Sequence, residues 1–188
     1  GAGGGTNDGH KIAVGGFGGD SITISSVQGS GNTPETARER AIAGDNAAKQ
    51  WTRRVSTTLA GKTLGILGLG AIGVELARKA EALEMHVIGT RRGSGDLPHV
   101  DRVYRPEATD DVLAASDFVV LLLPATPATE NFIDAARLSR MKKTAWLVNF
   151  GRGALIKDED LVAAVQAGTI AGAVLDVFRT EPLPAEHP

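Results

Sequence analysis

Short apolar runs and longer amphipathic segments alternate along the chain from Leu59 onward. Apolar runs bounded by glycine, proline or charged residues are typical of buried strands, and they occupy Thr63–Leu67, Met85–Gly89, Phe118–Leu123, Ala145–Val148 and Gly172–Val177. Apolar residues at helical spacing lie between them, in Ile72–Leu83, Thr109–Ala115, Asp134–Met141 and Glu159–Ala167. These repeated strand–helix units predict an α/β fold, a doubly wound parallel sheet with right-handed crossovers.

Polar residues and one glycine mark the ends of these predicted helices. Thr109 or Asp110, Asp134 and Asp158 stand where an N-cap is expected, because their side chains can accept a hydrogen bond from the first turn. Gly168 is placed to end the last helix.

The segment before Leu59 has a weaker pattern. Lys11–Val14 and Ile24–Val27 are short candidate strands, and Glu35–Trp51 is a candidate helix with small apolar residues. Because these residues form no wide apolar stripe, we expect them to bury little core. Residues 1–10 receive no predicted structure.

Composition narrows the class of protein. The chain has 188 residues, of which 42% are hydrophobic and 22% charged, and its net charge is -2. Near-neutral charge without a basic run argues against nucleic acid or an anionic membrane as a partner. With 0 cysteines, the chain has no disulfide, thiolate zinc site or cysteine nucleophile. Its 4 histidines show no metal-ligand spacing, so we predict no metal site. We expect a cytoplasmic protein, because no apolar run reaches membrane-spanning length and no signal peptide is visible.

A glycine motif joins the first predicted strand to the following helix. Gly68, Gly70 and Gly73 give G-x-G-x-x-G at this turn. The first glycine permits a tight turn, the second lets a pyrophosphate approach the backbone, and the third lets the helix pack on the strand. The N–H groups at Ala71 and Ile72 would then face the phosphates. The strand–turn–helix–strand context predicts a dinucleotide site.

Arginines follow the second predicted strand, where NAD-binding versions of this fold place an acidic residue for the ribose hydroxyls. That window holds Thr90, Arg91 and Arg92, and the nearest acids are Glu84 and Asp96. Since a guanidinium grips a phosphate and a carboxylate repels it, we favour NADP over NAD. Solvated loop arginines are the simpler alternative.

Charged residues also follow the later strands. Arg152 lies between two glycines in NFGRG, which leaves its guanidinium approachable for a carboxylate. Asp176 closes the last apolar run, where a carboxylate at the edge of an apolar core needs a hydrogen-bonding or charged partner. Glu181, just beyond, reads by itself as an exposed turn residue.

The chain resembles the D-isomer-specific 2-hydroxyacid dehydrogenase family in GKTLGILGLGAIG, LLLPATPATENFI, LVNFGRGALI and GAVLDVFRTEPLP. The resemblance implies a Rossmann-type sheet over residues 56–188, preceded in residues 1–55 by an incomplete substrate-domain and interdomain segment. It implies hydride transfer between NAD(P)H and a small 2-oxo or 2-hydroxy acid of the glyoxylate, hydroxypyruvate or phosphoglycerate type. We also expect a homodimer.

The resemblance also implies roles for individual residues. Arg152 matches the arginine that holds the substrate carboxylate and polarises its carbonyl, and Glu181 matches the glutamate that tunes a catalytic histidine. Asp176 matches the residue that receives the nicotinamide carboxamide. The expected cofactor contacts are Gly68, Gly70, Ala71, Ile72, Gly73, Thr90, Arg91, Arg92, Leu123, Pro124, Thr129, Phe150, Gly151 and Asp176.

The chain departs from the family pattern at both ends. The catalytic histidine of the family lies downstream of the glutamate, and the printed sequence ends at Pro188 before that position. The front is short, and abrupt junctions predict a Cα spacing above about 3.8 Å between Thr23 and Ala48. A cofactor-sensing module without catalysis is the alternative function, although a pure binder needs neither Arg152 nor Glu181. A nucleotide-sugar enzyme would need Tyr-x-x-x-Lys, and Tyr104 is followed at that spacing by Ala108.

Overall fold

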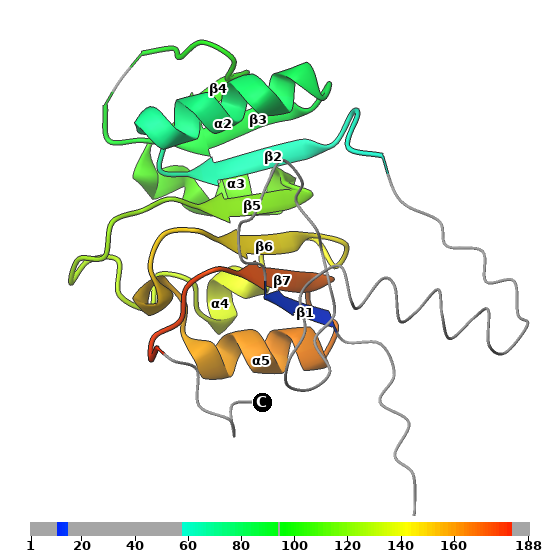
Figure 1. The fold of residues 1–188 in the computed structure, drawn as a ribbon, viewed down its shortest axis with the longest axis vertical. Helices are drawn as coiled ribbons and strands as arrows, with labels where there is room; N and C mark the ends of the chain where they lie inside the picture. Colours follow the sequence, from blue (N-terminus) through cyan, green and yellow to red (C-terminus); the bar gives the residue numbers. More distant parts are fainter. Residues whose placement is uncertain (1–10, 15–57, 94, 182–188) are drawn as a thin grey trace, which may run out of the picture.

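The computed structural model describes residues 11–14, 58–93 and 95–181. Within them, seven parallel strands form one sheet in the order β1-β7-β6-β5-β2-β3-β4 (Figure 1). The strands are β1 Lys11–Val14, β2 Thr63–Leu67, β3 His86–Thr90, β4 Arg102–Tyr104, β5 Phe118–Leu121, β6 Trp146–Asn149 and β7 Gly172–Leu175. From β2 the chain runs outward to β3 and β4, then returns to β5 on the other side of β2. This reversal confirms the predicted doubly wound α/β fold.

Helices cover both faces of the sheet. They are α2 Ala71–Ala82, α3 Thr109–Ala115, α4 Ala135–Leu138 and α5 Asp158–Gln166, with single-turn 3₁₀ helices η1 Pro106–Ala108 and η2 Gly153–Leu155. Ala77 and Ala80 of α2 pack with Ile66 on one face of β2. Leu67, the next residue, faces the other layer, which contains buried residues of α3, α4 and α5. Successive strand residues point to opposite faces, so one short apolar strand serves both layers.

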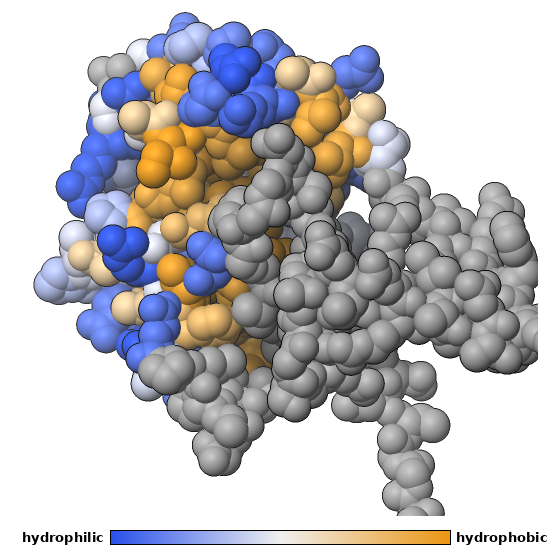
Figure 2. Space-filling model, viewed as in Figure 1, coloured by the Kyte–Doolittle hydropathy of each residue, from blue (hydrophilic) through white to orange (hydrophobic). Residues whose placement is uncertain are grey.

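Among the described residues, the α2 layer includes several apolar side chains that are not fully buried. Phe118, Val148 and Phe150 belong to this layer and are only partly buried. Figure 2 shows apolar surface in the middle of the described part of this view, beneath the polar outer surface of α2. None of the helices in the described ranges is long and apolar enough to span a membrane.

The helix ends show where local prediction works and where it fails. Asp134 is the N-cap of α4, since its Oδ1 accepts the Arg137 N–H at 2.9 Å, and Gly168 follows α5 with φ +66, so both predictions are confirmed. The cap predictions for Thr109 and Asp110 are wrong, because η1 leads directly into α3 and Ala108 is its N-cap. Asp158 is also not a cap. It lies inside the first turn of α5, where its charge favours the positive end of the helix dipole.

The bounds of the other elements agree with the prediction in part. The predicted strand Thr63–Leu67 and helix Thr109–Ala115 have the observed bounds. The apolar run through Leu123 overestimates β5, which ends at Leu121, and α4 is a single turn that ends before Met141. The pattern missed β4, a short edge strand. The candidate strand Lys11–Val14 is confirmed, and it pairs with β7.

Several predictions for the front of the chain lie outside the described residues. They are the strand Ile24–Val27, the helix Glu35–Trp51 and the interrupted backbone between Thr23 and Ala48. The division of the chain at residues 55 and 56 therefore stays a prediction.

Asp117 ties together the amino ends of three neighbouring strands, at the sheet edge opposite the glycine motif. Its carboxylate accepts the Thr63 N–H at 2.9 Å and a hydrogen bond from Lys142 Nζ at 3.0 Å, and its carbonyl accepts the Trp146 N–H at 3.0 Å. Burial opposes ionisation of Asp117, but the Thr63 and Lys142 contacts outweigh it and hold the pKa of this carboxyl below its ordinary value.

Candidate functional site

The glycine motif lies between the carboxyl end of β2 and the start of α2. Gly68 has φ +110, and an added Cβ would lie 2.9 Å from the Leu122 backbone. At Gly73 it would lie 2.8 Å from the Gly68 carbonyl oxygen. At Gly70 an added Cβ meets nothing within 4 Å. Packing therefore requires glycine at Gly68 and Gly73, whereas Gly70 presents open backbone.

N–H groups without an acceptor among the described residues adjoin this open backbone. The first helical hydrogen bond of α2 runs from the Val74 N–H to the Gly70 carbonyl at 3.0 Å. The N–H groups of Ala71, Ile72 and Gly73 precede it and have no intrahelical acceptor. The Ala71 and Ile72 side chains are exposed, Ile72 by 72%. An open glycine beside the dipole end of a twelve-residue helix fits the pyrophosphate of a dinucleotide.

The loop after β3 borders the glycine motif directly. Thr90 is buried, and its carbonyl accepts the Gly68 N–H at 3.2 Å and the Leu69 N–H at 2.9 Å. Arg91 follows, half-buried, and its N–H donates to the Tyr104 carbonyl at 3.1 Å. Arg92 is exposed. Among the described residues, no carboxylate forms an ion pair with either arginine.

The loop after β5 lies on the other side of the glycine motif. Leu123 is partly buried and Pro124 is exposed. Thr129 is buried, and its hydroxyl donates to the Pro124 carbonyl at 2.6 Å and accepts the Thr126 N–H at 2.9 Å. This hydroxyl shapes the loop from within, and its predicted contact with cofactor stays a prediction.

Asn149, which sequence reasoning did not select, organises the loop after β6. Its side chain is fully buried, Oδ1 accepts the Gly151 N–H at 3.0 Å, and Nδ2 donates to the Arg152 carbonyl at 2.9 Å. An added Cβ at Gly151 would lie 3.0 Å from the Leu123 carbonyl oxygen, so this loop and the β5 loop are in close contact. Phe150, between Asn149 and Gly151 in the chain, is partly buried. The available signal was an asparagine at the end of an apolar strand, a position typical of side-chain-stabilised turns.

Arg152 and Glu181 lie on neighbouring turns. Arg152 is exposed and donates through Nη1 to the Gly151 carbonyl at 2.8 Å. Gly153 packs on the chain that leaves β7, since an added Cβ would lie 2.0 Å from the Phe178 carbonyl carbon. One carboxylate oxygen of Glu181 accepts the Phe178 N–H at 2.9 Å.

Asp176 and Arg179 complete this end of the sheet. Asp176 directly follows β7, is exposed, and donates its N–H to the Asn149 carbonyl at 3.2 Å. The Arg179 guanidinium donates to the Asn131 side chain and to the Ile156 carbonyl, the latter at 3.1 Å. Sequence reasoning missed Arg179, because its partners lie far away in the chain.

The predicted residues thus form a continuous row at the carboxyl ends of adjacent parallel strands. The loops that carry Arg91, Gly70, Pro124, Arg152 and Asp176 follow β3, β2, β5, β6 and β7 in spatial order. Each loop contacts its neighbour through the hydrogen bonds and close approaches just described. The described residues contain no cluster of three His, Asp or Glu side chains able to hold a metal ion.

The family model for the NAD-binding domain of D-isomer-specific 2-hydroxyacid dehydrogenases matches residues 35–188. The chain belongs to this family. The glyoxylate/hydroxypyruvate reductase B of Yersinia pestis is 41% identical over 128 residues, which are 68% of this chain and 39% of that protein.

Solved structures of family members agree in fold. A D-isomer-specific 2-hydroxyacid dehydrogenase family protein from Aeromonas salmonicida gives a TM-score of 0.74 at 36% identity, over 80% of this chain and 49% of that one. A D-isomer-specific 2-hydroxyacid dehydrogenase from Xanthobacter autotrophicus Py2, in complex with NADPH and MES, gives a TM-score of 0.71 at 34% identity, over 79% of this chain and 47% of that one. The chain therefore spans less than half the length of these relatives.

Proposed function

We propose that this chain is the cofactor-binding part of an NADP-dependent oxidoreductase that interconverts a small 2-oxo acid and its 2-hydroxy acid. The observation that carries the proposal is the open backbone of Gly70 beside free N–H groups, in the same row of loops as Arg152. A dinucleotide across this row would point one end toward β3 and the other toward β6 and β7.

The cofactor, when bound, supplies or accepts a hydride. Ala71 and Ile72 offer N–H groups to the pyrophosphate, and Asp176 receives the nicotinamide carboxamide. Arg152 binds the substrate carboxylate and polarises the neighbouring carbonyl, a task that suits an exposed guanidinium held by its bond to the Gly151 carbonyl. Glu181 orients and tunes the histidine that exchanges a proton with the substrate oxygen.

Arg91 and Arg92 carry the preference for NADP. They occupy the position of the acidic residue that would accept hydrogen bonds from the ribose hydroxyls of NAD. No carboxylate of the described residues forms an ion pair with them. The NADPH complex of the Xanthobacter relative supports this choice. The name of the Yersinia relative supports glyoxylate or hydroxypyruvate as the substrate. A sensing module without catalysis is disfavoured, because sensing needs neither Arg152 nor Glu181.

Titration of the 188-residue chain with NADPH and NADH tests the cofactor choice. We expect tighter binding of NADPH, and we expect Arg91→Asp to narrow or reverse the preference. One lost charge-assisted contact is worth roughly 1.5–3 kcal/mol, about tenfold or more in affinity. Equal affinities for the two cofactors in the unaltered chain would refute the NADP assignment.

We extend the proposal to a homodimer in the cytoplasm. The location follows from the need for an intracellular pool of NADP(H), and cell fractionation tests it. The partly buried Phe118 and Val148 on the α2 side of the sheet are compatible with burial against a second copy. Light scattering of the purified protein at the monomer mass would refute the dimer.

A further inference from the structure

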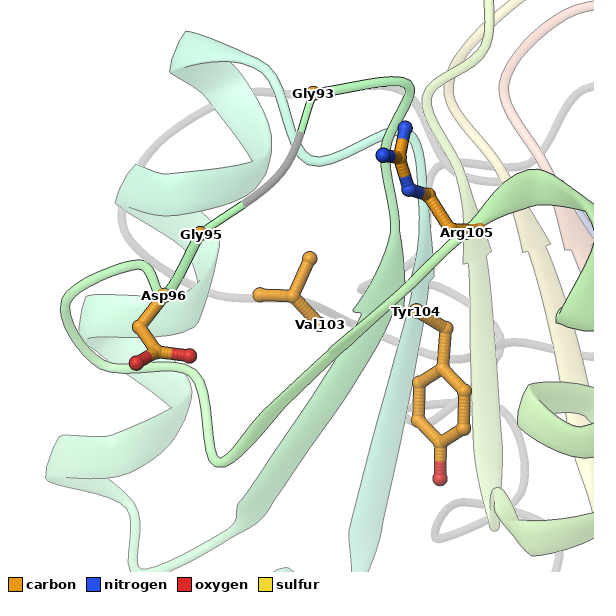
Figure 3. A pocket seen from close by; sticks show the side chains of 6 residues that line it. All are labelled: Gly93, Gly95, Asp96, Val103, Tyr104 and Arg105. Atoms are coloured by element: carbon orange, nitrogen blue, oxygen red, sulfur yellow. The ribbon is translucent and has the colours of Figure 1, made fainter.

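The end of β4 borders a hollow next to the loop after β3, which carries Arg91 and Arg92 and is called the arginine loop below. The hollow encloses about 170 Å³ and is lined by Gly93, Gly95, Asp96, Val103, Tyr104 and Arg105 (Figure 3). Arg105 and Asp96 come from opposite walls, and Figure 3 shows the Arg105 guanidinium near Gly93, away from the Asp96 carboxylate. The hollow therefore has a cationic end and an anionic end.

Arg105 holds the arginine loop through its backbone. Its Nη1 donates to the Arg92 carbonyl at 2.6 Å, and the Arg91 N–H donates to the Tyr104 carbonyl at 3.1 Å. These two bonds fix the peptide before Arg91 and the peptide after Arg92 to the end of β4. The Arg91 side chain folds back over Gly93, where an added Cβ would lie 2.7 Å from a guanidinium nitrogen.

The local charge is unbalanced. Elsewhere in the described residues, Arg78, Arg137, Arg140 and Arg179 form ion pairs with carboxylates, whereas the isolated Arg102 and Arg152 do not. No carboxylate forms such a pair with Arg91, Arg92 or Arg105 within the same part of the chain. Like charges held together without a counterion repel one another, so this end of the hollow favours an anion. A guanidinium with a single hydrogen bond to a carbonyl keeps other N–H donors for that anion.

We infer that Arg105 is a specificity-determining residue for the cofactor, acting on the 2′-phosphate from the carboxyl end of β4. It positions the Arg92 carbonyl, and it adds its own positive charge near Gly93, where the Arg91 guanidinium also lies. This inference rests on the proposed function, because a 2′-phosphate distinguishes NADP from NAD. It adds a residue that directly follows β4, a strand that carries no part of the glycine motif.

Equilibrium titrations of the 188-residue chain test the inference without requiring turnover. The ligands are NADPH, NADH and the fragments adenosine 2′,5′-bisphosphate and AMP. We expect Arg105→Ala to weaken NADPH and the bisphosphate about tenfold, with NADH and AMP changed less than about twofold. Arg105→Lys keeps the charge and is expected to recover part of the loss, but not all, because lysine lacks the planar fork.

Arg102→Ala is the matched control. Arg102 begins β4, three residues before Arg105; its guanidinium lies 4.6 Å from the Tyr104 ring centroid, and it does not line the hollow. We expect its loss to leave the ratio of the NADPH and NADH affinities unchanged.

The outcomes separate the two claims. An unaltered chain that prefers NADPH, with an Arg105→Ala variant that keeps the full preference, overturns the role of Arg105 and leaves the proposed function intact. Equal weakening of NADPH and NADH binding also overturns the role of Arg105 in specificity, since it would show that Arg105 only stabilises the loop. An unaltered chain without preference overturns both claims.

Discussion

Gly70 separates the ligand role of the glycine motif from its structural role. In Gly70→Ala the new methyl group meets no atom within 4 Å, and the backbone at φ -95 and ψ -160 is accessible to alanine. Alanine restricts the unfolded chain but is a poorer N-cap than glycine, and these effects oppose each other. We therefore expect the free energy of unfolding to change by less than about 1 kcal/mol.

Cofactor binding should respond differently, because the methyl group enters the space through which a pyrophosphate reaches the α2 N–H groups. Losing one charge-assisted hydrogen bond costs roughly 1.5–3 kcal/mol, so the affinity for NADPH should fall by about tenfold to a hundredfold. Isothermal titration calorimetry measures the affinity, and thermal unfolding followed by circular dichroism measures the stability of the same samples.

Gly73→Ala is the matched control. Its methyl group would lie 2.8 Å from the Gly68 carbonyl oxygen, a backbone atom that must move. Overpacking of this kind costs roughly 1–3 kcal/mol, or about 2–4 °C in Tm per kcal/mol for a chain of this size. A stable Gly70→Ala variant that binds NADPH as tightly as the unaltered chain refutes the reasoning.

Two further predictions concern the supports of the sheet and the site. Asp117→Ala should lower the free energy of unfolding at pH 7 by roughly 1–3 kcal/mol, because the Thr63 N–H and Lys142 lose their partner. Since the pKa of Asp117 is depressed in the folded state, its contribution is complete above the unfolded value of about 4 and disappears as pH falls through the folded pKa. Denaturant unfolding from pH 7 to 3 should show the two chains converging, and a constant difference would contradict this. Asn149→Ala should lower Tm by several degrees and weaken NADPH binding, because the Gly151 N–H and the Arg152 carbonyl lose their buried partner. An unchanged Tm would contradict the role assigned to Asn149.

The sequence predicted those features that depend on neighbouring residues. Apolar runs located the central strands, because a strand covered on both faces has few polar positions. The glycine motif located the phosphate loop, because at Gly68 only a glycine tolerates both the positive φ and the close approach of the Leu122 backbone. β4 was missed because an edge strand of three residues needs no apolar run.

Features that depend on distant contacts could not be predicted in this way. The cap role of Thr109 failed because a 3₁₀ turn precedes α3 and leaves no room for a cap at that residue. The bond from Arg105 to the Arg92 carbonyl and the contacts of Arg179 join residues that only the folded sheet brings together. Arg152 and Glu181 were selected by resemblance, and the packing of Gly153 on Phe178 explains how their turns become neighbours.

The most direct test of the account is a backbone amide chemical-shift map of the 188-residue chain during titration with NADPH. The proposed dinucleotide site predicts that the largest shifts fall on Gly70 to Ile72, Arg91 to Gly93, Phe150 to Arg152 and Asp176. All of these residues lie at the carboxyl ends of parallel strands. Amides at the opposite edge, around Thr63 and Asp117, should hardly move. Saturable shifts confined to that opposite edge, or no shifts at millimolar NADPH, would contradict the central claim.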